Sequence, residues 1–183
     1  RFLYVCYDNQ AYMNTGIQRS SATPMGAHTT TAPSGKKSAG KVQSRKDLTA
    51  IMVAHNVPYA AQTAIGFHND LISKVQKALA VNGATFMNIM QPCRLGWAYP
   101  PEDTVRMGRL SADTCVWPIY EVINGEYTLN YKPKQKKPVL EWLKSQGRFK
   151  HLLRPENENI VKQIQADVDR NWEKLLKLCE MTK

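Results

Sequence analysis

Phe2-Leu3-Tyr4-Val5-Cys6 is a short apolar run, and Tyr7-Asp8-Asn9-Gln10-Ala11-Tyr12-Met13-Asn14-Thr15-Gly16 follows it directly. Aromatic and β-branched residues in so short a run predict a buried strand. In open α/β sheets, ligands bind just beyond the carboxyl ends of the strands. Residues 8–16, here called the corner, are therefore expected to line a ligand site.

The corner carries the donors that a metal-bound diphosphate needs. The side-chain oxygen of Asn9 and the main-chain carbonyl of Ala11 are hard oxygen ligands for Mg²⁺, which usually fills its shell with substrate phosphates and water. Asn14, Thr15 and Gly16 add an amide, a hydroxyl and a permissive backbone position that let N–H groups approach phosphate oxygens. The alternative is that these residues are ordinary turn chemistry after a strand.

Helical and strand patterns alternate up to residue 93. A helix is expected from Arg45 to His55, a strand over residues 57–63, a helix from Asp70 to Gly83 and a strand over residues 84–90. Strands separated by helices predict parallel pairing with right-handed crossovers. The fold class is therefore α/β, with helices flanking a parallel sheet.

Beyond Cys93 the pattern changes, so we divide the chain into residues 1–93 and an extension over residues 94–183. Asn124-Gly125 between residues 116–122 and 127–131 predicts a β-hairpin. Residues 132–138 form a basic, proline-containing connector. An amphipathic helix follows from Pro155. Its apolar stripe is Val161, Ile164, Val168, Trp172, Leu175 and Cys179. We expect this stripe to pack on another subunit, and packing on its own domain is the alternative.

Residues 20–44 are rich in Ser, Thr, Pro, Gly and Lys. Loops of this length in compact domains are usually either functional or disordered. We favour an ordered flap near the ligand site. His28 within it receives no role.

Composition and charge exclude several classes of function. The chain has 183 residues with 43% hydrophobic and 22% charged side chains, which is ordinary for one globular domain. No apolar run approaches the roughly 18 residues of a membrane span, and no signal peptide is visible. The net charge of +10 is spread along the chain, with nine basic and three acidic residues in 1–93 and sixteen and twelve in 94–183. No nucleic-acid motif accompanies it.

The four cysteines are far apart, which argues against a disulfide framework and favours a reducing, cytoplasmic location. Cys93 differs from the others because it follows a predicted strand, in Gln91-Pro92-Cys93. A lone loop cysteine is weak support for a metal site, since a [4Fe–4S] cluster takes four thiolates.

Residues 7–20 resemble the second half of the thiamine-diphosphate signature of 2-oxoacid:ferredoxin oxidoreductase β subunits, above all the pyruvate synthase branch. The resemblance covers roughly residues 1–130. It continues through Ser21-Ala22-Thr23-Pro24, Arg45-Lys46-Asp47, Gln91-Pro92-Cys93, Gly108-Arg109-Leu110 and Trp117-Pro118-Ile119-Tyr120-Glu121.

The resemblance implies thiamine diphosphate, Mg²⁺ and a [4Fe–4S] cluster as cofactors. Asn9 and Ala11 would ligate Mg²⁺, Asn14 would also lie near the reacting centre, and Cys93 would ligate the cluster. The cofactor-binding residues implied are Asp8, Asn9, Ala11, Tyr12, Asn14, Thr15 and Gly16. The family's Gly-Asp-Gly motif, with its metal-binding aspartate, and the other three cluster cysteines lie upstream. We therefore expect this chain to be incomplete at its N-terminus.

The activity implied is oxidative decarboxylation of a 2-oxoacid, pyruvate by default, to acyl-CoA and CO₂ with reduction of ferredoxin. The implied partners are the 2-oxoacid-binding α, CoA-binding γ and ferredoxin-like δ subunits, together with ferredoxin, which a diffuse positive field would attract. The glutamate that activates the cofactor is expected on a partner subunit. Branched 2-oxoacids, 2-oxoglutarate or oxalate are alternative substrates. A non-oxidative thiamine-dependent decarboxylase or synthase and, from another class, a basic interaction module are the alternative functions.

Overall fold

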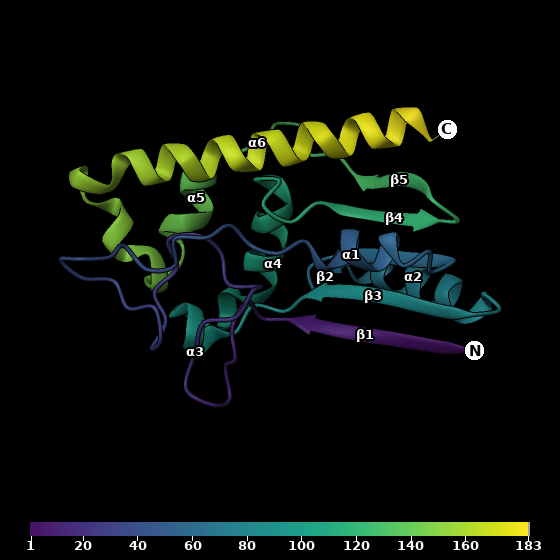
Figure 1. The fold of residues 1–183 in the computed structure, drawn as a ribbon, viewed down its shortest axis with the longest axis horizontal. Helices are drawn as coiled ribbons and strands as arrows, with labels where there is room; N and C mark the ends of the chain where they lie inside the picture. Colours follow the sequence, from purple (N-terminus) through teal and green to yellow (C-terminus); the bar gives the residue numbers. More distant parts are fainter. Residues whose placement is uncertain (183) are drawn as a thin grey trace.

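A five-stranded mixed sheet organises the chain (Figure 1), and the computed structural model describes residues 1–182. The strands lie in the order β1-β3-β2-β4-β5. Their bounds are β1 Phe2–Asp8, β2 Tyr59–Ala64, β3 Ala84–Met90, β4 Ile119–Ile123 and β5 Glu126–Tyr131. β1, β3 and β2 pair in parallel, which confirms the predicted α/β class.

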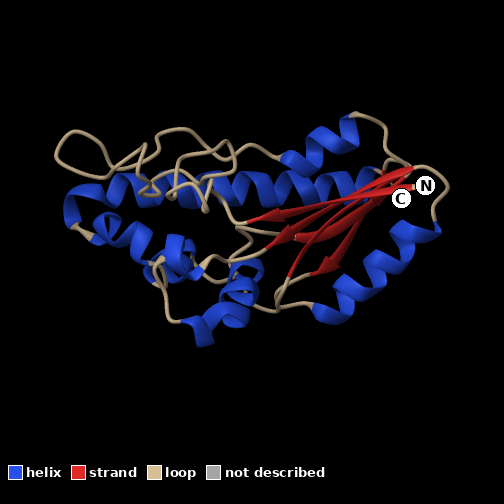
Figure 2. Ribbon diagram, turned by 90° about the horizontal axis from the view of Figure 1, so that it is seen from below, coloured by secondary structure: helices blue, strands red, loops and turns tan. Residues whose placement is uncertain are grey.

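Two helices connect the parallel strands, and helices lie on both faces of the sheet (Figure 2). The two connecting helices are α1, Leu48–Ala54, and α2, His68–Ala80. Asp47 caps α1 because its side chain accepts a hydrogen bond from the Ala50 N–H at 3.0 Å. In the parallel register Asp8 lies opposite Met90, so β1 and β3 end together at one edge of the sheet.

The predicted hairpin forms, and it extends the sheet. Asn124 and Gly125 adopt positive φ angles of 49° and 88°, as a two-residue hairpin turn requires. β4 pairs antiparallel with β2, and β5 pairs antiparallel with β4. The division of the chain at residue 93 remains a prediction, but its second part contributes two strands to the same sheet.

The extension is mostly helical, and most of its short helices were not predicted. They are α3 Arg94–Trp97, η1 Pro101–Asp103, α4 Thr104–Asp113, α5 Val139–Lys144, η2 Gly147–Leu153 and η3 Pro155–Asn157. The long helix α6, Glu158–Met181, confirms the amphipathic helix and begins three residues later than predicted. Apart from α4, the helices that were not predicted span seven residues or fewer and show little of the repeated apolar spacing that makes a long helix visible in a sequence.

The expectation that α6 packs on another subunit is wrong for the buried part of its stripe. Ile164, Trp172, Leu175 and Cys179 are at most 9% exposed within this chain. Trp172 and Leu175 belong to one apolar cluster with Tyr120 and Val122 of β4. The hairpin therefore supplies apolar surface for the C-terminal part of the stripe, while Ile164 packs in a separate cluster with Trp142 and Leu152.

Residues 20–44 form neither helix nor strand, as predicted, and hydrogen bonds hold them in place. Lys41 is only 6% exposed, and its ammonium donates to the main-chain carbonyls of Ser21, Thr23 and Ser44 at 3.3, 2.6 and 3.4 Å. The Thr30 N–H donates to the carbonyl of Ile17 at 3.0 Å. The loop therefore packs against the end of the corner, and its role as a flap remains a prediction.

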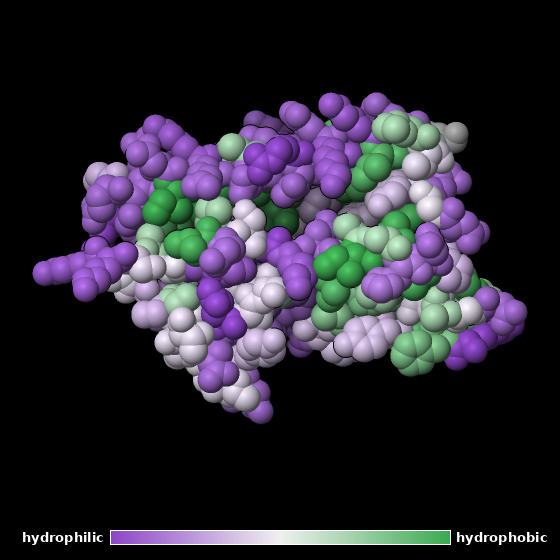
Figure 3. Space-filling model, in the orientation of Figure 1, coloured by the Kyte–Doolittle hydropathy of each residue, from purple (hydrophilic) through white to green (hydrophobic). Residues whose placement is uncertain are grey.

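Hydrophilic side chains run along α6, and apolar side chains gather below it, over the region of α1 and β2 (Figure 3). No helix among residues 1–182 combines the length and apolarity needed to cross a bilayer.

Candidate functional site

The corner and the Cys93 loop lie side by side at one edge of the sheet. The corner follows β1 and the Cys93 loop follows β3, its parallel neighbour. The Gln91 N–H donates to the Asp8 carbonyl at 3.1 Å, directly joining the two chain segments. The fold thus brings together the two candidate sites that are more than 70 positions apart in the sequence.

Asp8 points inward and is 5% exposed. One carboxylate oxygen accepts the Gln10 N–H at 2.9 Å, and the other pairs with the Arg45 guanidinium at 3.0 Å. Arg45 in turn stacks over the Trp117 ring at 4.2 Å. Both oxygens of Asp8 thus hold the turn in place, and its direct contact with a cofactor remains a prediction.

Gln10 fixes the backbone of the corner in an unusual conformation. Its φ is +67°, a left-handed value that costs a side-chain-bearing residue free energy and needs support from its surroundings. The Gln10 carbonyl accepts the Thr23 hydroxyl at 2.7 Å, and its side-chain oxygen accepts the Arg148 guanidinium at 2.6 Å. Gln10 is 1% exposed, so these bonds are shielded from water.

The remaining corner residues form a small projecting loop. Tyr12 and Gln18 exchange two backbone hydrogen bonds of 2.9 and 3.0 Å, which close the loop at its base. Asn14, Thr15 and Gly16 at the tip are exposed, and Gly16 has a φ of +110°. These tip groups are therefore available to a ligand outside the described chain.

Asn9 and Ala11 lie at the entry to this loop. The Asn9 side-chain oxygen accepts the Ala11 N–H at 3.3 Å, an arrangement typical of a turn. A carboxamide oxygen has a second lone pair that can bind a metal while the first accepts this hydrogen bond. The turn interpretation and the metal interpretation are thus compatible at this position.

Trp97 connects the corner to Cys93. The main-chain N–H of Trp97 donates to the Cys93 carbonyl at 2.8 Å, and its indole N–H donates to the Asn9 carbonyl at 2.9 Å. A Cβ atom at Gly96 would lie 2.2 Å from the Met13 sulfur, so α3 and the corner are in close contact. Cys93 itself is half-buried at the start of α3.

Sequence reasoning missed the buried arginine beneath the corner. Arg148 reaches it from η2, which approaches α3 closely because Gly147 has no side chain; a Cβ there would lie 2.7 Å from that of Ala98. Arg148 and its partner Gln10 are 138 positions apart, and no local pattern signals the contact. The sequence likewise assigned no role to Trp97.

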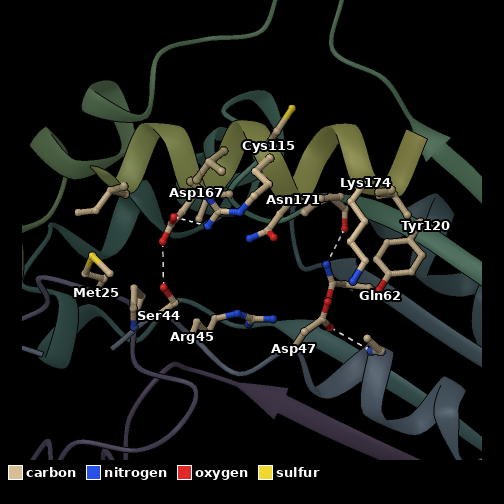
Figure 4. A pocket seen from close by; sticks show the side chains of 18 of the residues that line it. Met25, Ser44, Arg45, Asp47, Gln62, Cys115, Tyr120, Asp167, Asn171 and Lys174 are labelled. Carbon is tan, nitrogen blue, oxygen red and sulfur yellow. Dashed lines mark hydrogen bonds and ion pairs between the residues drawn. The ribbon is translucent and has the colours of Figure 1, made fainter. Parts of the chain in front are cut away.

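A separate cavity of about 400 Å³ lies between α6, the start of α1 and the sheet (Figure 4). Arg45, Asp47, Asp167 and Lys174 line it, and Asp167 accepts the Ser44 hydroxyl at 2.9 Å. Gln10 and Arg45 also line this cavity, so its wall supports the inner side of the corner. The predicted ligands Asn9, Ala11, Asn14 and Cys93 are not among the described residues that line it.

The donors of the corner and of the Cys93 loop fit the predicted cofactors as partial ligand sets. Asn9 and Ala11 offer two neutral oxygens, which suits an Mg²⁺ ion whose shell is completed by phosphate and water. Cys93 offers one half-buried thiol. Among the described residues no group of three His, Cys, Asp or Glu side chains could hold a metal alone. An ion or cluster bound by these residues would take its remaining ligands from outside residues 1–182.

Comparison with known proteins identifies the family. Residues 1–89 match the model of the thiamine pyrophosphate enzyme C-terminal TPP-binding domain. Pyruvate synthase subunit PorB of Methanocaldococcus jannaschii is 51% identical over 88% of this chain and 54% of its own length. PorB of Thermotoga maritima is 48% identical over 100% of this chain and 57% of its own length. Ketoisovalerate oxidoreductase subunit VorB of Pyrococcus furiosus is 40% identical over 98% and 57%.

The chain spans little more than half the length of these curated relatives. A solved structure of 2-oxoglutarate:ferredoxin oxidoreductase from Magnetococcus marinus is also similar, with a TM-score of 0.45 and 24% identity over 50% of this chain and 30% of that chain. The family model and the relatives confirm the resemblance seen in residues 7–20. The chain therefore belongs to the family of 2-oxoacid:ferredoxin oxidoreductase β subunits that includes PorB and VorB.

Proposed function

We propose that this chain is the part of a 2-oxoacid:ferredoxin oxidoreductase β subunit that binds Mg²⁺-thiamine diphosphate and supplies one ligand to a [4Fe–4S] cluster. The observation that supports this most directly is the contact between the corner and the Cys93 loop through Trp97. A cofactor that releases electrons and a cluster that receives them must lie close together. In this fold the two candidate sites share one edge of the sheet.

In this proposal the projecting loop binds the diphosphate end of the cofactor. The Asn9 side chain and the Ala11 carbonyl bind Mg²⁺, and Asn14, Thr15 and Gly16 contact phosphate oxygens. Asn14 would also lie near the reacting centre, and Tyr12, whose ring is exposed, would contact the cofactor. Asp8 acts from below by fixing the turn through Gln10 and Arg45. When bound, thiamine diphosphate supplies the electron sink for loss of CO₂ from the 2-oxoacid.

Pyruvate is the proposed substrate because the PorB relatives share 44–51% identity with this chain, against 40% for the VorB relatives. The proposed complex contains α, γ and δ subunits and uses coenzyme A and ferredoxin. The chain's net charge of +10 would speed encounter with an acidic electron carrier. That contribution should weaken as salt is added.

The substrate test uses the purified complex that contains this β subunit. Pyruvate, 2-oxoisovalerate, 2-oxoglutarate and oxalate are compared with coenzyme A and a viologen acceptor. We expect the fastest viologen reduction with pyruvate, dependent on coenzyme A and lost when Mg²⁺ and thiamine diphosphate are removed. Release of CO₂ from pyruvate by a colourless complex that reduces no viologen would instead support the non-oxidative alternative.

The cluster test compares Cys93→Ser with Cys6→Ser in the same complex. Cys6 is a matched control because it is also half-buried but lies within β1, two residues before the strand's last residue Asp8, and not in the loop beyond β3. Cys93→Ser should lower the iron and sulfide content by about one cluster and remove its electron paramagnetic resonance signal, since the cluster needs its fourth thiolate. A full complement of iron in Cys93→Ser would contradict the proposed role of Cys93.

A further inference from the structure

Arg148 is a buried cation without a directly bonded anion. It is 5% exposed, and among residues 1–182 no carboxylate oxygen accepts a hydrogen bond from it. Its two side-chain partners are neutral, the amide oxygens of Gln146 at 2.8 Å and Gln10 at 2.6 Å. A buried charge is costly unless nearby groups compensate it, so its surroundings call for an explanation.

Aromatic rings provide part of the compensation. The guanidinium carbon lies 3.9 Å from the centre of the Trp97 ring and 4.9 Å from that of Phe149. Rings at these distances attract a cation through their negative faces. Trp97 is also the residue that contacts both Asn9 and Cys93. Arg148 is therefore packed against the side chain that joins the two candidate sites.

Two of the groups that act electrostatically on Arg148 belong to the candidate sites. Burial lowers the pKa of the Arg148 guanidinium, and electrostatic interactions with Asp8, Cys93 and Tyr99 act to raise it. Asp8 is already bonded to Arg45. Cys93 would become permanently negative if it bound iron, because the thiolate is the metal ligand.

From this geometry we infer that Arg148 is a positioning residue that ties the Cys93 loop to the corner, and that its charge raises the reduction potential of the cluster held by Cys93. The inference rests on the proposed function. Reduction adds one electron to a cluster that is already anionic, and a nearby buried cation stabilises the more negative form. Net charge and hydrogen bonding around a cluster are among the factors that set its potential. The electron comes from oxidation of the 2-oxoacid and passes on to ferredoxin.

The test is a redox titration of the complete complex, followed by electron paramagnetic resonance of the cluster that disappears in Cys93→Ser. Arg148→Gln and Arg148→Met remove the charge, Arg148→Lys keeps it, and Arg154→Gln removes an equal charge from an exposed residue of the same segment. Within residues 1–182, the Arg154 side chain makes one ion pair, at 3.9 Å with Glu156 on the surface. The midpoint potential should become more negative in Arg148→Gln and Arg148→Met. It should stay near the wild-type value in Arg148→Lys and Arg154→Gln.

Wild-type midpoints in both neutral variants would overturn the inference. If the neutral variants lose the cluster, Arg148→Lys distinguishes the two explanations. A cluster retained in Arg148→Lys supports the role of charge, and loss of the cluster in all three variants overturns the inference. Arg148→Met guards against simple misfolding, because an apolar side chain leaves no unpaired charge in the core. Failure of the proposed function would give a different result. In that case the wild-type complex and Cys93→Ser would show the same cluster signals.

Discussion

The corner and the residues packed beneath it form two layers with opposite properties. The outer layer, Asn9, Ala11, Asn14, Thr15 and Gly16, is exposed or half-buried and makes few bonds within the chain. The inner layer, Asp8, Gln10, Trp97 and Arg148, is at most 5% exposed and tied to four separate segments. The difference indicates that the inner layer provides stability and shape, while the outer layer presents donors to a ligand.

The largest expected effect is on stability, in the inner layer. Trp97→Ala removes a fully buried indole and its hydrogen bond to Asn9. The free energy of unfolding should fall by about 3–5 kcal/mol, as for other buried aromatic truncations. Urea unfolding of the β subunit measures it. Leu95→Ala is the control on the same helix, since Leu95 is 68% exposed and should change the value by less than about 0.5 kcal/mol. Equal losses of unfolding free energy in Trp97→Ala and Leu95→Ala would contradict the distinction between the layers.

The next effect tests the inward orientation of Asp8. Asp8→Asn keeps the shape of the side chain and removes its charge from Arg45. A hydrogen bond to a charged group in a buried setting contributes about 2 kcal/mol, so unfolding free energy should fall by that amount. Urea unfolding again measures the change. Glu156→Gln, at an exposed ion pair, should leave the urea midpoint unmoved. An unchanged midpoint in Asp8→Asn would place Asp8 among the outer residues.

The outer layer should show the reverse pattern. Asn9→Ala and Asn14→Ala should each weaken Mg²⁺-dependent binding of thiamine diphosphate about tenfold, which corresponds to about 1.4 kcal/mol. Unfolding free energy should change by less than about 0.5 kcal/mol. Calorimetric titration of the complex gives the affinity. Asn69→Ala, on the exposed side of α2, is the control and should leave affinity unchanged. Loss of stability without loss of affinity would favour the simple-turn interpretation.

The smallest expected effect lies where the layers touch. Gly96→Ala places a methyl group where the Met13 sulfur now lies and should displace the outer loop. Affinity for thiamine diphosphate should fall a few-fold, less than about 1 kcal/mol. Stability should change little, because alanine gains up to about 1 kcal/mol in a helix and offsets the steric cost.

The double variant Gly96→Ala, Met13→Ala serves as its rescue. Removing the Met13 side chain relieves the contact, so affinity should return toward the wild-type value. No recovery would show that Gly96 affects the corner by another route.

Much of the fold was predictable because it depends on local patterns. β3 begins and ends at the predicted residues, and β1, α1 and β2 lie within a few residues of their predicted bounds. Asn124-Gly125 forms the expected turn because few other residues adopt two successive positive φ angles. The helices α3 and α5 were not predicted because each spans fewer than two turns. The ten-residue helix α4 was missed although its buried residues Met107, Leu110 and Ser111 recur at helical spacing.

The residues of the outer layer, and Cys93, could be proposed as ligands from the sequence because they are contiguous or follow a recognisable strand, and their roles remain predictions. Arg148 could not be proposed, since its role depends on Gln10 and Trp97, which lie 138 and 51 positions away. The contact between the α6 stripe and β4 likewise could not be predicted, because it depends on tertiary packing. Apolar periodicity fixes which face of a helix is buried, but it does not specify the partner.

The amino-acid sequence alone determined the strand, the turn and the donors that follow it, because backbone preferences and side-chain chemistry act over a few residues. Only the tertiary structure decided that Cys93 lies against the corner, that Asp8 turns inward and that a buried arginine supports both. Those contacts join segments distant in sequence. They form only when parallel strands align their carboxyl ends and the extension folds back across them.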